Sequence, residues 1–431
     1  MKNELYHYMA VPSIYRVGVP TEITVLAVDA RYTFTDDGIY TVAMMPLREN
    51  QIRFDMGAVT VKAAVREGKL VFTYTFPREQ EYFLRVFLNG DRLFQISVYA
   101  LEDDLYERRP LKGDTHVHSC RSDGQDTPAV VAANYRAAGF DFMALTDHHR
   151  YEPSVEAIEA YRDVKLGMTQ LRGEEVHSPE TYLHIVNFGG SFSVNKLFQD
   201  DKDMFYREVG YINRTEPIPF TDERSRFVYA SALWCARMIR RGGGIAIFPH
   251  PYWISNMFNV PDDMTRALLM NDVFDAFELI GGQSAHENNF QTQRYYELRE
   301  EYLEKRGKRL SIPLLGASDS HGTINRPWFN RKYSVVFAKS RSEADIVSAI
   351  REGQCCAVEV YEDSSNYTVH GTYRLSSYAR FLCENYFPRT EKFCATEGEL
   401  MREYTLGYDV RELLAKRCHV GDSFYRMVFG K

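Results

Sequence analysis

Three stretches of the sequence repeat one pattern, and this repeat constrains the fold more than any other feature. In each stretch a segment with helical periodicity ends at glycine, and a short apolar segment follows, over residues 140–145, 245–248 and 312–315. Each apolar segment runs into polar residues that include histidine or aspartate. Alternating helices and buried strands of this kind are typical of a parallel α/β barrel, whose site lies at the carboxyl ends of its strands. An open doubly wound sheet would place the site similarly.

The helices before these strands have recognisable ends. We predict helices beginning at Pro128, which follows two possible capping residues, and over residues 228–240 and 291–305. Glycine follows each helix, at positions 139, 242–244 and 307. The long polar stretch 189–227 interrupts this rhythm, and we expect it to be a loop insertion over the active face. Its arginines Arg214, Arg224 and Arg226 would be available there.

The residues before the repeat indicate β structure. Segments 59–65, 70–76 and 82–88 are rich in β-branched and aromatic residues. Asn89-Gly90 lies between two apolar segments, which is a strong hairpin signal. We therefore predict a small all-β sandwich over residues 1–109, an α/β domain over 110–360, and a partly helical extension over 361–431.

Charge and composition narrow the range of functions. The net charge of −7 argues against a surface that binds nucleic acid, although it permits a small anionic substrate. The chain begins without an apolar signal core, and no later apolar stretch is long enough to span a bilayer. We therefore expect a cytoplasmic protein with a small-molecule partner, no nucleic acid and no membrane contact. A homo-oligomer is possible.

Histidines and carboxylates are placed at the predicted strand ends. His116 and His118 are two residues apart, so on an extended segment both project to one face. Asp319 and His321 repeat that spacing, and Glu175 supplies a carboxylate that can bridge two cations. Each element alone is more often structural than metal-binding. His184 by itself would be interpreted as a core residue, but with it four such elements lie in one domain, and together they predict a cluster of divalent metal ions.

These motifs resemble those of the PHP (polymerase and histidinol phosphatase) family of metal-dependent phosphoesterases. The resemblance is carried by segments 114–119 with 122–124, 145–148, 173–175 and 318–321, together with His184 and the segment 248–251. It covers about residues 113–358. The resemblance implies a distorted (β/α)7 barrel, and the preceding β unit is similar to that of the stand-alone branch that includes carbamate-cleaving hydrolases.

Carried over residue by residue, the resemblance implies three metal ions, which would be zinc, manganese or iron. The first would be held by His116, His118, Glu175 and Asp319. Glu175 would bridge to a second ion that His184 and His250 complete. The third would be held by Asp123, His148 and His321. Asp123 stands where some members carry histidine, so occupancy of the third position is open. Glu174 competes with Glu175, which the family pattern favours.

The expected reaction is hydrolysis of a small phosphate ester by a hydroxide that two cations share. His149, His177 and His286 are candidates to protonate the leaving group, and Arg172 and Arg326 could pair with phosphate. A carboxyl-ester or carbamate hydrolase would use the same metal site. A binding module with an inert metal fold is the alternative from another class, although every ligand position is filled.

Overall fold

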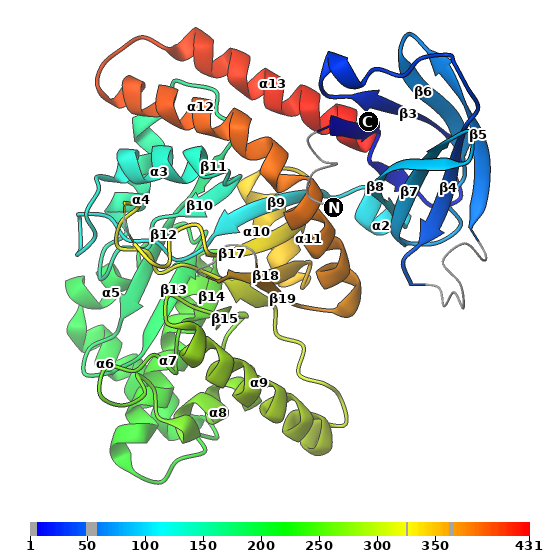
Figure 1. Cartoon of the computed structure of the whole chain (residues 1–431). Coiled ribbons are helices and arrows are strands. Elements are labelled where there is room, and N and C mark those ends of the chain that lie inside the picture. Colours follow the sequence, from blue (N-terminus) through cyan, green and yellow to red (C-terminus); the bar gives the residue numbers. More distant parts are fainter. Residues whose placement is uncertain (1–6, 49–57, 325, 362–365) are drawn as a thin grey trace. The chain divides into compact units, whose positions relative to one another are not determined.

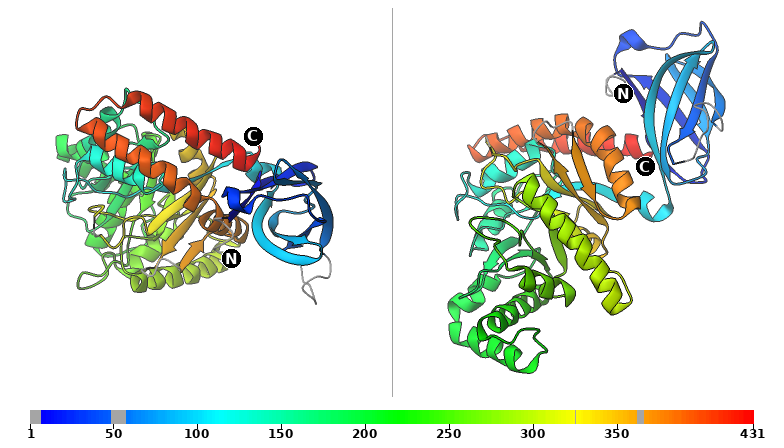
Figure 2. Two further views of the ribbon diagram at one scale, coloured as in Figure 1. Left: turned by 45° about the horizontal axis from the view of Figure 1, so that its top comes forward. Right: turned by 60° about the horizontal axis from the view of Figure 1, so that its bottom comes forward.

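The chain divides into two compact units, which the computed structural model describes over residues 7–48, 58–324, 326–361 and 366–431 (Figures 1 and 2). The first unit holds Met1–Arg109, Ser377–Thr390 and His419–Lys431, and the second holds Pro110–Ser376 and Glu391–Cys418. The predicted domain boundary after residue 109 stays a prediction. The predicted extension 361–431 is shared between the two units.

The first unit is built on one curled sheet of eight strands in the order β1-β3-β6-β5-β4-β7-β8-β2. The strands are β1 (Tyr8–Val11), β2 (Ile14–Arg16), β3 (Thr21–Ala27), β4 (Tyr40–Pro46), β5 (Val59–Arg66), β6 (Lys69–Tyr74), β7 (Gln80–Leu88) and β8 (Asp91–Leu101). The first half of β5 pairs with β4 and its second half pairs with β6, so the sheet curves around its core at this strand. The left view of Figure 2 shows the resulting curl.

The predicted hairpin is confirmed. Asn89 and Gly90 have φ values of 53° and 97° between β7 and β8, as a two-residue turn with left-handed backbone requires. Inside the curl lies a core of aliphatic and aromatic side chains, among them Ile23, Val42, Leu70 and Val86, each fully buried. Two short helices, η1 (Ala30–Tyr32) and α2 (Asp103–Tyr106), complete this part of the unit.

The second unit is a mixed α/β structure with two sheets. One has the order β11-β10-β9-β17-β18-β19 and the other β12-β13-β14-β15-β16. The strands of the first are β9 (Arg109–Asp114), β10 (Phe142–Ala144), β11 (Thr169–Leu171), β17 (Lys332–Ala338), β18 (Cys355–Val360) and β19 (Tyr367–His370). Those of the second are β12 (Gly173–His177), β13 (His184–Phe188), β14 (Ile245–Phe248), β15 (Ala276–Ile280) and β16 (Leu314–Gly316).

Parallel pairing is found where the repeat predicted it, but it does not extend to every strand. Strand β10 pairs in parallel with β9 and β11, and β15 with β14 and β16. Strand β13 is antiparallel to β12 and β14, and β17 to β18. Among the described residues, strand pairing gives two sheets rather than one closed ring, so the α/β class is confirmed and the barrel stays a prediction.

Helices surround the two sheets (Figure 1). They are α3 (Pro128–Ala137), α4 (Glu152–Ala160), α5 (Val194–Asp200), α6 (Lys202–Thr215), α7 (Glu223–Arg241), α8 (Asp262–Met270), α9 (Ala285–Arg306) and α10 (Glu343–Arg351). Three C-terminal helices follow, α11 (Tyr373–Asn385), α12 (Phe387–Thr405) and α13 (Arg411–Phe429). The predicted helices before β10, β14 and β16 are all present, and Gly307 ends α9 with a left-handed φ of 68°.

The expectation of a loop over residues 189–227 was wrong, because this stretch holds α5, α6 and the start of α7. Ser193, Asp201 and Asp222 cap the amino ends of these helices with their side chains. Phe205, Val209 and Ile212 recur at helical spacing and are buried in the same core as Trp234 of α7. Arg226 is used structurally, since its guanidinium donates to the carbonyls of Phe220 and Asn213.

No helix among the described residues is long and apolar enough to cross a membrane.

Candidate metal centre

Two short parallel bridges bring the predicted ligands together beyond the strand ends. Val117, after β9, pairs with Ser320, after β16, and His148, after β10, pairs with Glu175 of β12. Side chains alternate along extended backbone, so the residues flanking Val117 and Ser320 share one side of this bridge. They are His116 and His118 on one segment and Asp319 and His321 on the other. The bridges also join the two sheets at the site.

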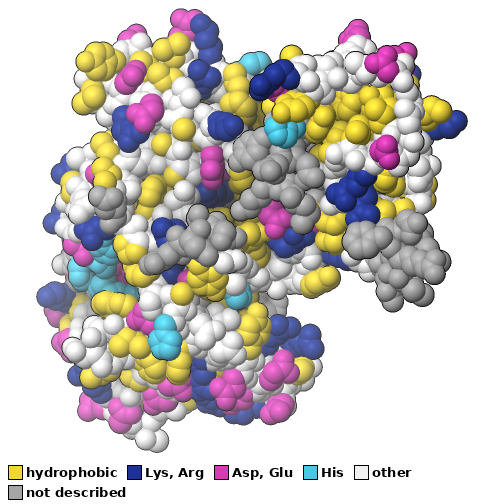
Figure 3. All heavy atoms as spheres, viewed as in Figure 1, with side chains coloured by type: hydrophobic (Ala, Val, Ile, Leu, Met, Phe, Trp, Pro, Cys, Tyr) yellow, Lys and Arg dark blue, Asp and Glu magenta, His cyan; other side chains and the backbone are white. Residues whose placement is uncertain are grey.

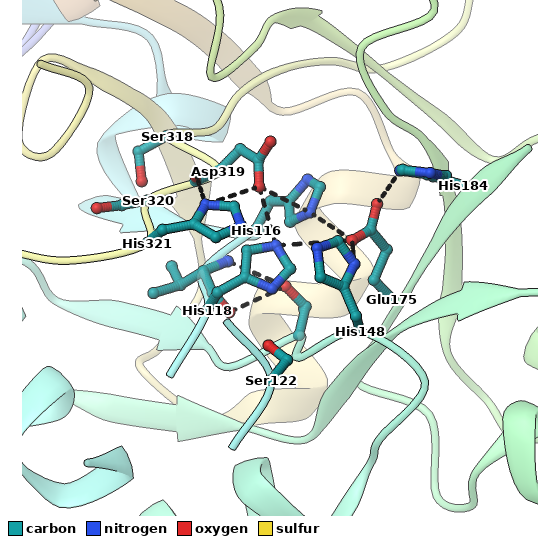
Figure 4. A network of polar contacts seen from close by, with 12 residues as sticks. His116, His118, Ser122, His148, Glu175, His184, Ser318, Asp319, Ser320 and His321 are labelled. Carbon is teal, nitrogen blue, oxygen red and sulfur yellow. Dashed lines mark hydrogen bonds and ion pairs between the residues drawn. The ribbon is translucent and has the colours of Figure 1, made fainter. Parts of the chain in front are cut away.

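Glu175 lies at the centre of the cluster and is fully buried (Figure 4). Its Oε1 faces Nδ1 of His184 at 2.8 Å and Nε2 of His250 at 3.4 Å. Its Oε2 faces Nδ1 of His148 at 2.6 Å and Nε2 of His116 at 3.5 Å. The two oxygens of one carboxylate therefore serve two different sets of imidazoles, which is the arrangement of a ligand shared by two cations.

Two aspartates complete the cluster. Asp319 Oδ1 lies 2.9 Å from Nε2 of His118 and 3.4 Å from Nε2 of His116. Asp123 lies at the outer edge, 3.2 Å from Nε2 of His321 and 3.6 Å from Nε2 of His148. The nine ligands that the resemblance implied thus lie in one place. Histidine side chains also reach the surface as a group in Figure 3.

The ligand atoms fit metal ions better than they fit one another. Nε2 of His116, both nitrogens of His118, both carboxylate oxygens of Glu175 and Oδ1 of Asp319 are buried without a hydrogen bond among the described residues. Buried polar atoms are normally satisfied, because an unpaired one costs about 1–3 kcal/mol. Several groups of these atoms lie within 4.8 Å of one another, close enough to share an ion. Imidazole and carboxylate together suit zinc, manganese or iron.

The grouping of these atoms is consistent with more than one ion. One group contains Glu175, His184 and His250, and another contains His118, Asp123, His148 and His321. These residues include those that the resemblance implied for the second and third ions. A further group contains His148, Glu175 and His177, so His177 is as close to the shared carboxylate as the expected ligands are.

Carboxylate charge dominates the electrostatics. Burial alone would lower the pKa of His116, but the carboxylates of Asp319, Glu175 and Glu278 outweigh it and raise this pKa well above its ordinary value. Burial would raise the pKa of Glu175, yet the neighbouring His184 and His116 hold it well below its usual range. Buried carboxylates that keep their charge next to imidazoles attract cations.

Sequence reasoning missed several groups that support the ligands. Glu278 on β15 is fully buried and its Oε2 lies 3.0 Å from Nδ1 of His116, which fixes the orientation of that imidazole. Asp147 accepts hydrogen bonds from the backbone and hydroxyl groups of Ser119 and Ser122, and so holds the segment that leads to Asp123. A carboxylate within a buried apolar strand was the signal available for Glu278.

The choice between Glu174 and Glu175 follows from alternation along β12. The side chain of Glu174 accepts hydrogen bonds from Asn187, Ser193 and Asn195 and from the backbone of Val194. Burial raises the pKa of Glu174 even so. Glu174 therefore belongs to a structural network, and Glu175 points into the cluster.

Backbone conformation is unusual at two of the ligands. His250 and Asp319 have φ values of 27° and 46°, in the left-handed region that non-glycine residues seldom adopt. Such conformations persist where the surrounding structure fixes them, and they are concentrated at functional sites. Gly282 is part of that surrounding structure, because a Cβ there would lie 2.3 Å from Cβ of Asp319.

The remaining predicted residues fall into two sets. His149 and His177 lie at the exposed rim with ring centroids 4.4 Å apart, and Nε2 of His177 is 2.9 Å from Nδ1 of His148. Arg326 lines a pocket of about 260 Å³ together with Asp319 and His321. In contrast, Arg172 is exposed, and its positive charge acts on the hydroxyl of Tyr151, where it lowers a pKa that burial raises. His286 is exposed on α9, and no contact joins it to the cluster among the described residues.

No protein-family profile matches the chain. A curated relative, the DNA polymerase/3′-5′ exonuclease PolX of Bacillus subtilis, is 30% identical over 97 residues, which are 20% of this chain and only 16% of the relative.

Two solved structures are also similar. One is a two-domain protein from Bacteroides vulgatus that contains a predicted PHP-like metal-dependent phosphoesterase. It is 19% identical in sequence, the match covers 62% of this chain and 76% of that chain, and the TM-score is 0.40. The other is an amidohydrolase from Chromobacterium violaceum with bound sulfate. It is 17% identical in sequence, the match covers 50% of this chain and 89% of that chain, and the TM-score is 0.33. The sequence motifs of the chain resemble those of the PHP family, and its buried histidine and carboxylate groups are suited to holding metal ions.

Proposed function

We propose that this chain is a metal-dependent phosphoesterase that hydrolyses a small phosphate ester, in a distorted (β/α)7 barrel. One observation carries the proposal. Among the described residues, neither oxygen of the fully buried Glu175 has a hydrogen bond of normal geometry, and each oxygen faces its own set of imidazoles. A fully buried carboxylate left in this state is unfavourable unless cations compensate it.

The ligand set supports three places for the ions. His116, His118, Asp319 and Glu175 would hold one, Glu175 with His184 and His250 a second, and Asp123 with His148 and His321 a third. When bound, such ions supply an activated water and neutralise charge on the phosphoryl group. The set of imidazoles and carboxylates supports zinc, manganese or iron in these places.

Residues of the chain itself would bind the ester and complete proton transfer. Arg326 supports the phosphate reading, because it lines the pocket beside Asp319 and His321 and has no polar partner among the described residues. A guanidinium matches two phosphoryl oxygens at once. His177 and His149 at the rim are the candidates to give a proton to the leaving alcohol, since both are partly exposed beside His148.

The test combines metal analysis with a substrate panel. The purified protein should contain at least two transition-metal ions per chain by elemental analysis. It should hydrolyse phosphomonoesters in the presence of manganese or zinc in preference to phosphodiesters and carboxyl esters. Glu175→Gln should lower both metal content and turnover at least about 100-fold, because it removes the charge that two ions would share.

A matched control makes this test specific. Glu159→Gln makes the same change at an exposed residue of α4 whose partner is Arg162, and it should leave both quantities unchanged. Fewer than one metal ion per active chain would overturn the metal site. Turnover of carboxyl esters or carbamates alone would keep the metal site and overturn the phosphate substrate.

A further inference from the structure

Two of the three tryptophans of the chain line the pocket beside the metal ligands. The pocket of about 260 Å³ is bounded by Trp253, Trp328, Gly282, Arg326 and Pro327, and it reaches Asp319 and His321. The third tryptophan, Trp234, is buried in the core. Trp253 is 41% exposed. A cavity of about 150 Å³ is enough for benzene, so this pocket has room for a planar aromatic group.

The first tryptophan is fixed to the backbone of the metal centre. Its amide donates to the carbonyl of His250 at 3.1 Å, and its carbonyl accepts from Asn259 at 2.8 Å. The amide of Ile254 donates to Oε1 of Glu287 at 2.8 Å, which fixes the next residue as well. The backbone that carries Trp253 is therefore held in place before any ligand binds, so little backbone conformational entropy is lost on binding.

The second tryptophan is held by a buried cation. Nζ of Lys332 lies 4.6 Å from the ring centroid of Trp328. That ammonium is itself fixed, 2.9 Å from Oε1 of Glu359, and both side chains are almost completely buried. Cation–π contact with this buried lysine restrains the ring of Trp328.

We propose that this pocket binds a planar aromatic group on the alcohol side of the phosphate ester. The inference rests on the proposed phosphoesterase function and names the class of its substrate. Trp253 and Trp328 give the aromatic group two rings to contact, while Arg326 in the same pocket pairs with a phosphoryl oxygen. The phosphorus end of the ester then lies toward Asp319 and His321, because these expected metal ligands line the same pocket.

The test uses two esters that differ in planarity and little in leaving-group chemistry, benzyl phosphate and cyclohexylmethyl phosphate. The metal-loaded protein should show a kcat/KM for the benzyl ester about two- to tenfold above that for the cyclohexylmethyl ester, as expected for one aromatic contact beyond area burial. Trp253→Leu keeps an apolar side chain and removes the ring, so this ratio should fall toward one. Trp253→Phe should restore part of it.

Binding gives a readout that does not depend on turnover. Benzylphosphonate should bind the same protein more tightly than cyclohexylmethylphosphonate in isothermal titration calorimetry, and Trp253→Leu should remove the difference. Tyr211→Leu, which changes a 62% exposed aromatic residue on α6, should keep the preference in both assays.

The two proposals fail in different ways. Equal rates and equal affinities for the two compounds, or a preference that survives in Trp253→Leu, would overturn the aromatic pocket and leave the phosphoesterase standing. A Trp253-dependent preference for benzylphosphonate without hydrolysis of either ester would overturn the phosphoesterase and keep the aromatic pocket. Absence of both hydrolysis and binding would overturn both.

Discussion

Replacement of Gly282 by alanine should disable the metal centre while the protein stays folded. A Cβ at this position would lie 2.3 Å from Cβ of Asp319 and 2.3 Å from the carbonyl oxygen of Ser318, where ordinary contact begins at 3.4 Å. Both distances are about 1 Å shorter than an ordinary contact. Asp319 must move to relieve part of this clash, because the backbone carbonyl of Ser318 cannot shift without distorting the chain. A misplacement of about 1 Å in a catalytic group lowers rates about 100-fold.

The cost to stability should be modest, about 1–3 kcal/mol, as for other overpacked sites. The assay is kcat/KM on a phosphomonoester, together with elemental analysis and the midpoint of thermal unfolding. Gly421→Ala is the matched control, since a Cβ there meets nothing within 4 Å and the residue lies inside α13. Gly282→Ala with normal metal content and normal turnover would refute the argument that close approach to Asp319 is needed.

Two further substitutions test the supporting carboxylate and the outer ion. Glu278→Gln should weaken metal binding about 10- to 100-fold in competition with a chelator, because it removes the charge 3.0 Å from Nδ1 of His116; unchanged affinity would show that this contact does not orient the ligand. His148→Ala should lower kcat/KM for a phosphomonoester at least about 100-fold and affect an aryl carboxyl ester much less, since a phosphoryl group spreads charge over three oxygens. A near-normal phosphatase rate in that variant, with the outer ion absent, would contradict a role for three metals.

The parts of the fold that could be predicted were those with local signals. The Asn89-Gly90 turn and the glycine that ends α9 were both found because a left-handed backbone strongly favours such residues. Residues 189–227 were misjudged because overall polarity was given more weight than helical spacing, although Phe205, Val209 and Ile212 carried that spacing. The antiparallel direction of β13 could not be predicted from local sequence patterns either, because strand direction is set by pairing in the tertiary structure.

The candidate site was easier to predict than the fold around it. Ligand atoms must converge on an ion, so the spacing of His116 with His118 and of Asp319 with His321 restricts the backbone strongly. Residues that only orient a metal-ligating side chain are not marked by a regular spacing in the sequence. Glu278 comes from a separate strand and meets His116 only through the tertiary structure.

The division of the chain into units has a consequence for its synthesis. Residues 377–390 and 419–431 complete the first unit, yet they leave the ribosome long after residue 109. Fully buried Tyr99 on β8 packs against Tyr378 and Phe381 of α11, with ring centroids 5.0 and 5.3 Å apart. At about 5–20 residues per second, roughly a quarter of a minute to a minute passes before those partners appear. During that interval the aromatic surface around Tyr99 has not yet received the residues of α11 that pack on it.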